Sequence, residues 1–248
     1  MHSSQKSIIT RFSLSPKELN GWKASLTERL VECYIEQRLI PRLKSQEGLE
    51  IVIFSTFAWF SVPDSQGFNP DFKNERVFFL SNGLLPTNEL LHNFETLTKT
   101  LENVPDGFLL KLKRTGESKP LRDGISEMGL QTMRSTRSAL MSRLHQAGNI
   151  DNIRSSGYAL VREIGFDSAE CDFNQQLPVV KGSIEVVEVK SGKGNLASNQ
   201  VQSYINVVKM GFPLRFFKVE IIDFKENQFE IRERLITNPD EIVTRIPI

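Results

Sequence analysis

The segment from Ser183 to Ser191, SIEVVEVKS, is the feature that most constrains the fold of this chain. In an extended strand, successive side chains alternate between the two faces of a sheet. Ile184 and Val186 share one face. Val187 and Val189 share the other. Apolar residues on both faces are typical of a central strand covered by helices on both sides. The segment therefore predicts an α/β fold with this strand inside its sheet.

Two charged residues, Glu188 and Lys190, interrupt the apolar pattern at the end of this strand. Their spacing places both side chains on one face, where isolated charges are costly unless they are paired or bind a metal ion. The same Glu-x-Lys spacing recurs at Glu117 to Lys119, in a segment predicted to be a loop. About one such match is expected by chance from composition. The alternative is that both side chains simply reach solvent where the strand ends.

A metal site at this strand end would need a second acidic residue on a neighbouring strand. The segment SAECDF supplies Asp172, and a turn around residues 181–183 would fold it back toward Glu188. If the turn falls at NQQLP instead, Asp167 takes the place of Asp172. Two carboxylates and a backbone carbonyl form a hard oxygen site that suits Mg²⁺ or Mn²⁺. With a lysine beside it, such a site is equipped to hydrolyse phosphodiester bonds.

The other elements follow from apolar periodicity and from turn residues. Helices are predicted at 16–43, 86–103, 125–146, 153–164 and 198–210, the last closed by Gly211. Strands are predicted at 49–62, 75–83, 107–113, 168–173, 183–191, 214–223 and 228–236. We expect an N-terminal α+β region over residues 1–120 and a compact α/β unit over residues 121–248.

The composition is that of a soluble globular protein, with 39% hydrophobic and 25% charged residues. A formal net charge of +1 gives no global signal for nucleic acid or membrane, so any basic surface must be local. No apolar run approaches the roughly 20 residues that span a bilayer. The two cysteines, Cys33 and Cys171, suggest neither a disulfide framework nor a zinc site. A cytoplasmic protein without membrane contact is expected.

Asp172, the run Glu188-Val189-Lys190, Gln200 and Gly211 resemble, in this order, the PD-(D/E)XK nuclease superfamily. The pattern is closest to its VRR-Nuc and Holliday-junction-resolvase-like members and covers about residues 157–223. The resemblance implies a restriction-endonuclease-like core, with a central mixed β-sheet flanked by helices. One departure is that Cys171, not proline, precedes Asp172.

The resemblance also implies a role for each matching residue. Asp172 and Glu188 would bind Mg²⁺ or Mn²⁺, with the Val189 carbonyl as a further ligand. Lys190 would act on the attacking water.

Two further residues have implied roles with open alternatives. Gln200 would help to position the water or the scissile phosphate; it is equally explained as a polar residue at a helix start, and Gln202 is the alternative for the role. Glu163 matches an extra glutamate that bonds to metal-bound water in many members, or else it lies on a solvated helix face.

The sequence therefore predicts a Mg²⁺-dependent endonuclease that hydrolyses DNA, with a restriction-type role favoured. Double-stranded DNA is the expected substrate. A homodimer is expected because cutting both strands with one active site per chain usually requires two-fold symmetry. The alternatives are a junction or repair nuclease, and a catalytically inactive nucleic-acid-binding or assembly subunit with the same fold.

Basic residues between Lys111 and Arg143, and in the loop SGKGN, are the candidates for binding DNA. Arginine side chains and glycine-flanked backbone suit phosphate oxygens. A solvated helix face explains the arginines equally well. The predicted contacts are Arg134, Arg137, Arg143 and Lys193.

Overall fold

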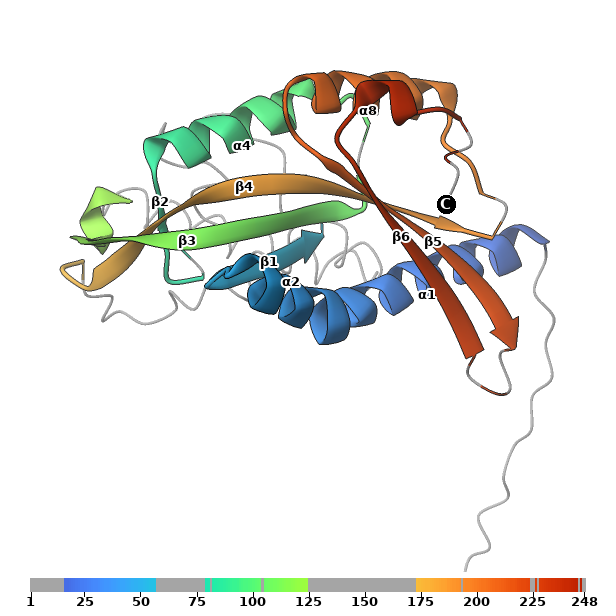
Figure 1. The fold of residues 1–248 in the computed structure, drawn as a ribbon, viewed down its shortest axis with the longest axis horizontal. Helices are drawn as coiled ribbons and strands as arrows, with labels where there is room; N and C mark the ends of the chain where they lie inside the picture. The colour runs from blue at the N-terminus through green and yellow to red at the C-terminus, as the bar shows by residue number, and fades with distance from the viewer. Residues whose placement is uncertain are drawn as a thin grey trace, which may run out of the picture.

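The computed structural model describes residues 16–56, 79–80, 82–103, 105–124, 173–192, 194–223, 226, 228–244 and 246. A mixed β-sheet lies at its centre (Figure 1). Its strands are β1 (Ile51–Thr56), β2 (Leu85–Pro86), β3 (Gly107–Pro120), β4 (Gln176–Ser191), β5 (Leu214–Asp223) and β6 (Gln228–Ile236). The strand order is β1-β3-β4-β5-β6, and β2 pairs with β4.

The sheet combines antiparallel and parallel pairing. The pairs β1/β3, β3/β4 and β5/β6 are antiparallel, whereas β4/β5 is parallel. The connection from β4 to β5 passes through the helix α8 (Ser198–Lys209), as a parallel pair requires a crossover. The predicted mixed α/β architecture is therefore confirmed.

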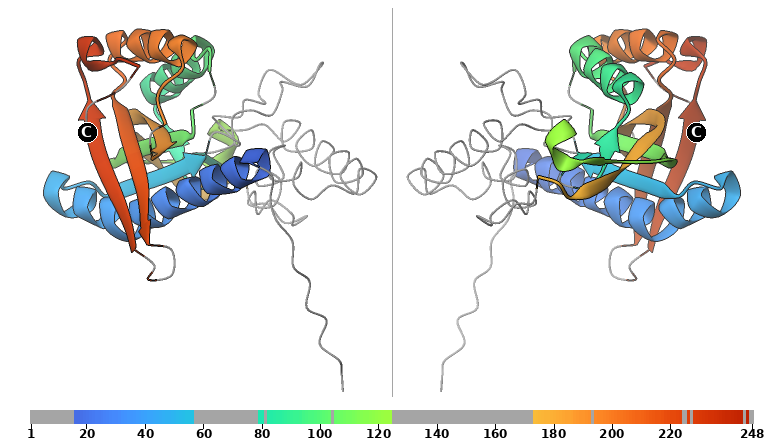
Figure 2. Two further views of the ribbon diagram at one scale, coloured as in Figure 1. Left: turned by 90° about the vertical axis from the view of Figure 1, so that its right-hand side faces the viewer. Right: turned by 90° about the vertical axis from the view of Figure 1, so that its left-hand side faces the viewer.

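Helices cover both faces of the sheet (Figures 1 and 2). On one face lie α1 (Pro16–Tyr34), the short π-helical segment η1 (Ile35–Leu39) and α2 (Ile40–Glu47). On the other lie α4 (Asn88–Thr100), whose first turn is capped by Thr87, and α8. Two 3₁₀ turns, η3 (Leu121–Asp123) and η4 (Pro239–Glu241), complete the described elements.

The strand β4 contributes to a separate hydrophobic core on each face, as its sequence predicted. Ile184 and Val186 belong to the core beneath α4 and α8. Val187 and Val189 belong to the core beneath α1 and η1. These side chains are buried, so β4 is a central strand covered on both sides.

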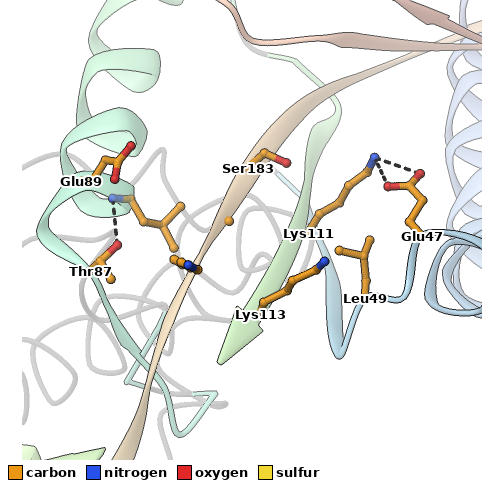
Figure 3. A pocket seen from close by; sticks show the side chains of 10 residues that line it. Glu47, Leu49, Thr87, Glu89, Lys111, Lys113 and Ser183 are labelled. Atoms are coloured by element: carbon orange, nitrogen blue, oxygen red, sulfur yellow. Dashed lines mark hydrogen bonds and ion pairs between the residues drawn. The ribbon is translucent and has the colours of Figure 1, made fainter. Parts of the chain in front are cut away.

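The predicted turn around residues 181–183 is wrong, because β4 is unbroken from Gln176 to Ser191. It pairs with β3 along most of its length, and Lys111 lies opposite Ser183 in the register (Figure 3). The glycine that suggested a turn, Gly182, instead permits close packing within the sheet. A Cβ atom there would lie 2.0 Å from the Lys111 carbonyl oxygen.

Several predicted elements are confirmed and two are corrected. The long first helix, the helices α4 and α8, and the strands β5 and β6 lie where the sequence predicts them. Gly211, with φ of +92°, ends α8. The predicted strand at 75–83 is wrong at Phe79 and Leu80, which are helical. Residues 117–119, predicted as a loop, belong to β3.

The sheet takes strands from both sides of residue 120, where two regions were expected to meet. β1 and β3 precede this position, and β4 to β6 follow it. The predicted division therefore falls between two paired strands of one sheet. Among the helices that the structure describes, none has the length and apolar character needed to cross a membrane.

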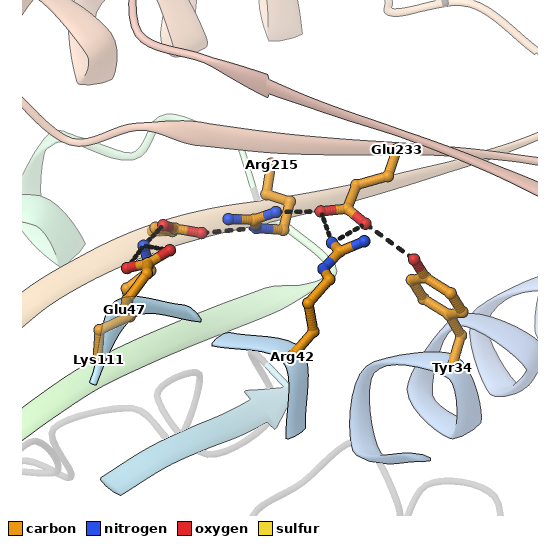
Figure 4. A network of polar contacts seen from close by, with 7 residues as sticks. Tyr34, Arg42, Glu47, Lys111, Arg215 and Glu233 are labelled. Carbon is orange, nitrogen blue, oxygen red and sulfur yellow. Dashed lines mark hydrogen bonds and ion pairs between the residues drawn. The ribbon is translucent and has the colours of Figure 1, made fainter. Parts of the chain in front are cut away.

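A network of buried ion pairs joins the sheet to α1 and α2 (Figure 4). Glu185 Oε2 accepts a hydrogen bond of 2.6 Å from Arg215 Nε, and Lys111 Nζ lies 2.7 Å from Glu185 Oε1. Arg215 also pairs with Glu233 on β6. The helix side chains that donate hydrogen bonds to Glu233 are Tyr34 and Arg42.

Candidate functional site

The predicted residues Glu188, Val189, Lys190 and Gln200 lie together where β4 ends beside the start of α8. Glu188 is only 1% exposed, which is rare for a carboxylate unless it is paired. Its Oε1 accepts hydrogen bonds from Lys190 Nζ and, at 3.1 Å, from Gln200 Nε2. Its Oε2 accepts from the hydroxyl of Tyr204. Three side chains thus donate hydrogen bonds to one buried carboxylate.

The helix α8 presents Gln200 and Tyr204 to Glu188 because residues four apart share one helix face. Gln200 lies in the first turn, where its Oε1 also accepts from the Ala197 backbone N–H at 3.1 Å. Tyr204 is fully buried. Burial, and then the negative charge of Glu188, raise the pKa of the Tyr204 hydroxyl. Tyr204 therefore keeps its proton and acts as a hydrogen-bond donor.

Asp106, which the sequence interpretation did not select, is the acidic residue that lies beside this cluster. It directly precedes β3, at the position where Gly107 pairs with Val187 of β4. Asp106 Oδ2 accepts a hydrogen bond of 2.6 Å from the Val189 backbone N–H. Burial, and then the negative charge of Glu188, raise the pKa of Asp106 to about 7. Two carboxylates from neighbouring strands therefore interact at one strand end.

The sequence signal for this acid is Pro105-Asp106, followed directly by the apolar run GFLLKL. A proline before the aspartate is the feature that was missing at Asp172. The turn that was expected to bring Asp172 opposite Glu188 does not exist, because β4 continues through it. Asp172 itself lies outside the described residues, as does its alternative Asp167.

Glu28 on α1 adds a third acid to the electrostatic surroundings of the site. Partial burial, and then the charge of Glu32, raise its pKa, and both Glu188 and Lys190 act on it as well. The helical acid predicted for this region, Glu163, lies outside the described residues. Among the described helical acids, Glu28 is coupled electrostatically to both Glu188 and Lys190.

The loop that carries Asp106 is tied to the N-terminal half of α8. The Glu102 backbone N–H donates to Ser203 Oγ at 3.3 Å. Asn103 Nδ2 donates to the Asn199 carbonyl at 3.0 Å, and Asn199 Nδ2 donates to Asn103 Oδ1 at 2.7 Å. These bonds fix the loop relative to the helix that contacts Glu188. The two carboxylates are therefore positioned by one connected set of elements.

The chemistry of the donor set fits a hard divalent cation. Within the described ranges, no group of three or more His, Cys, Asp or Glu side chains is placed to hold a metal ion. Asp106 and Glu188 are two carboxylates that interact electrostatically, and Mg²⁺ is commonly held by one or two carboxylates together with waters. Repulsion between these acids contributes to the raised pKa of Asp106. A bound cation would relieve that repulsion and favour the ionised pair.

Replacing Asp106 by asparagine is expected to stabilise the metal-free protein above pH 7. The folded carboxyl holds its proton up to about pH 7, whereas an unfolded aspartate loses it near 3.8. The folded state therefore binds more protons between these values, and this group's contribution to stability falls as pH rises through them. At pH 8 in EDTA we expect Asp106→Asn to raise the free energy of unfolding by about 2 kcal/mol, or the melting temperature by about 4–8 °C.

Thermal melts of both proteins at pH 5 and pH 8 measure this difference. The gain in melting temperature should be larger at pH 8, because asparagine does not ionise and so avoids the stability that Asp106 loses at this pH. Asp123→Asn, at an exposed position in η3, is the matched control and should have little effect at either pH. A lower melting temperature for Asp106→Asn at pH 8 would show that Asp106 serves the fold rather than a strained site.

The predicted nucleic-acid contacts Arg134, Arg137, Arg143 and Lys193 all lie outside the described residues. Comparison with known proteins finds no match to this chain among protein-family models, curated proteins or solved structures. The function must therefore be inferred from the geometry of the site itself.

Proposed function

We propose that this chain is a Mg²⁺- or Mn²⁺-dependent endonuclease of the PD-(D/E)XK type that hydrolyses DNA phosphodiester bonds. The observation that carries the proposal is the meeting of Asp106 with the Glu188-Val189-Lys190 run. The carboxylate of Asp106 accepts the Val189 N–H, and the Glu188 charge helps to raise the pKa of Asp106. Strongly perturbed acids next to a specific charged partner are typical of catalytic sites.

The surrounding fold supports the same proposal. A mixed sheet with helices on both faces agrees with the architecture that the resemblance implies. The sequence Pro105-Asp106, an apolar strand, Glu188-x-Lys190 and Gln200 follows the chain order expected of the superfamily, with Asp106 in place of Asp172. Tyr204 extends this set by holding the second oxygen of Glu188.

Asp106 and Glu188 would hold the divalent cation, with the Val189 carbonyl as a further oxygen donor. When bound, the cation would polarise the scissile phosphate and lower the pKa of an attacking water. Lys190 is more exposed than its partner, at 20% against 2% for the side chain of Glu188. Its ammonium can therefore stabilise negative charge that develops at the site's open side. Gln200 fixes the orientation of the Glu188 carboxylate.

The second candidate is a nucleic-acid-binding subunit of the same fold without catalysis. It is favoured by the complete hydrogen bonding of Glu188, since both carboxylate oxygens already have protein donors. A purely structural carboxylate would be satisfied in the same way. Activity measurements separate the two candidates.

The test is incubation of the full chain with plasmid, branched DNA and RNA in Mg²⁺, in Mn²⁺ and in EDTA. We expect DNA cleavage in either metal and none in EDTA. Ends at one sequence would indicate a restriction-type enzyme, and ends at the branch would indicate a junction nuclease. Binding without cleavage of any substrate would favour the inactive subunit. Cleavage that persists in EDTA would contradict the metal-dependent mechanism.

A further inference from the structure

A cavity lies on the β3/β4 pair, and its lining does not include Asp106 or Glu188. Its volume is about 380 Å³, and it extends from the start of α4 to the end of α2 (Figure 3). Leu49 and Leu90 contribute apolar walls. The polar and glycine residues that line it are Glu47, Thr87, Glu89, Lys111, Lys113, Lys181, Gly182 and Ser183.

Lys113 and Lys181 are directly opposite each other in the β3/β4 register. Cross-strand neighbours project from the same face of a sheet, and like charges at such positions are destabilising. Both side chains are exposed, and neither forms an ion pair with any residue that the structure describes. The two ammonium groups therefore lie beside the cavity without an ion pair to any described residue, and Glu89 is the carboxylate that shares the cavity wall with them.

Lys111 differs from these two lysines because its charge is already compensated. Its Nζ lies 2.9 Å from Glu47 and 2.7 Å from Glu185. This pairing also engages Glu47, one of the two carboxylates in the cavity wall. Lys113 and Lys181 remain against one further carboxylate, Glu89, so these two lysines give the cavity wall its excess of positive charge.

The β4 backbone adds hydrogen-bond donors at the same place. β2 pairs with β4 up to Val180, and β5 begins to pair at Val186. The Val180 carbonyl accepts a hydrogen bond from the Thr87 N–H, and the Val186 N–H donates to the Pro213 carbonyl, both on the side of β4 where β2 and β5 pair. Every second residue of a strand directs its backbone groups to the same side, so the N–H and carbonyl of Gly182 also face this side. No described strand covers Gly182 there. A glycine N–H beside lysines suits the approach of a phosphate oxygen.

We infer that Lys113, Lys181, Ser183 and Gly182 form a binding site for a phosphate group. Further exposed basic residues lie on β3 and η3 beyond the cavity, namely Arg114, Lys119 and Arg122. Several basic side chains spread along this end of the sheet suit the repeated phosphates of a nucleic-acid backbone better than a single ion. The choice of nucleic acid rests on the proposed function, whereas the phosphate site itself does not.

The salt dependence of duplex DNA binding, measured in EDTA to prevent cleavage, tests the site. Each lost phosphate contact reduces the slope of log K against log salt concentration by about 0.9, so Lys113→Gln/Lys181→Gln should reduce it by about 2. Lys44→Gln/Lys209→Gln removes the same charge from exposed positions on α2 and α8 and should leave the slope near that of the native chain. Lys113→Arg/Lys181→Arg should restore the slope.

Inorganic phosphate distinguishes the two sources of the ligand. A melting temperature that phosphate raises in the native chain, but not in the double glutamine variant, supports the site. If this occurs while both proteins show equal duplex slopes, the site binds free phosphate and the nucleic-acid assignment is overturned. If neither measurement responds to the two lysines, the site does not exist. The result is independent of catalysis, because cleavage of DNA by the native chain is measured separately.

Discussion

Replacing Glu188 by glutamine is expected to reduce Mg²⁺-dependent DNA cleavage by about 10³-fold or more. Glutamine has the same size as glutamate and can still accept a hydrogen bond from the Tyr204 hydroxyl, but it lacks the charge that would hold a divalent cation. Its amide group also cannot form the ion pair with Lys190. Cleavage rates on plasmid DNA measure the loss, and circular dichroism and thermal melts measure whether the fold persists.

The chain contains its own matched control for this variant. Glu117 has the same spacing to a lysine, lies on the neighbouring strand β3 and is exposed. Glu117→Gln is expected to cleave at the native rate. Lys190→Ala should resemble Glu188→Gln, and normal turnover by Lys190→Ala would remove the lysine from the proposed mechanism. Equal activity of the two glutamine variants would remove the site altogether.

The part of the site that could be predicted is the part that is local in sequence. Apolar residues on both faces identified β4, and helical spacing with a terminal glycine identified α8. Because β4 runs directly into the turn before α8, Glu188 and Gln200 had to lie near each other. Their hydrogen bond joins positions only 12 residues apart. Short-range sequence patterns were therefore sufficient to place Glu188 and Gln200 in one site.

The acidic partner could not be found in the same way, because it depends on which strands pair. Asp106 and Val189 are 83 positions apart, and no periodic pattern indicates that β3 lies beside β4. The Lys-Gly-Ser sequence at 181–183 is a normal turn signal. Pairing with β3 overrode it, because all three residues lie in the β3/β4 register and the flanking Val180 and Ile184 are buried. The error in the turn then led to the selection of Asp172.

The buried charges beneath α1 and α2 show the same dependence on tertiary structure. Glu185 follows the alternation of β4 onto the face that also carries Val187, where an isolated carboxylate would be costly. Its partners Arg215 and Lys111 come from the two strands on either side of β4. Sequence patterns do not reveal such compensation, since each charge alone looks like a surface residue.

Replacing Arg215 by methionine is therefore expected to destabilise the protein by about 3 kcal/mol. Methionine fills a similar volume, but Glu185 loses its 2.6 Å partner while remaining 2% exposed, and Glu233 loses its buried contact. The other pairs in the network, from Lys111 and Arg42, keep the loss at the lower end of the range for a broken buried ion pair. The melting temperature should fall by about 6–12 °C.

The control is Arg232→Met on β6, because Arg232 also pairs with two glutamates, Glu220 and Glu230, but at the surface. Exposed ion pairs contribute little to stability, so its melting temperature should remain close to that of the native chain. Because the Arg215 side chain lies on the opposite face of the sheet from Glu188, its loss should lower stability without changing the Mg²⁺ concentration needed for half-maximal cleavage at a temperature where both proteins are folded. A shift in that concentration would show that the network acts on the site through α1, which carries Glu28.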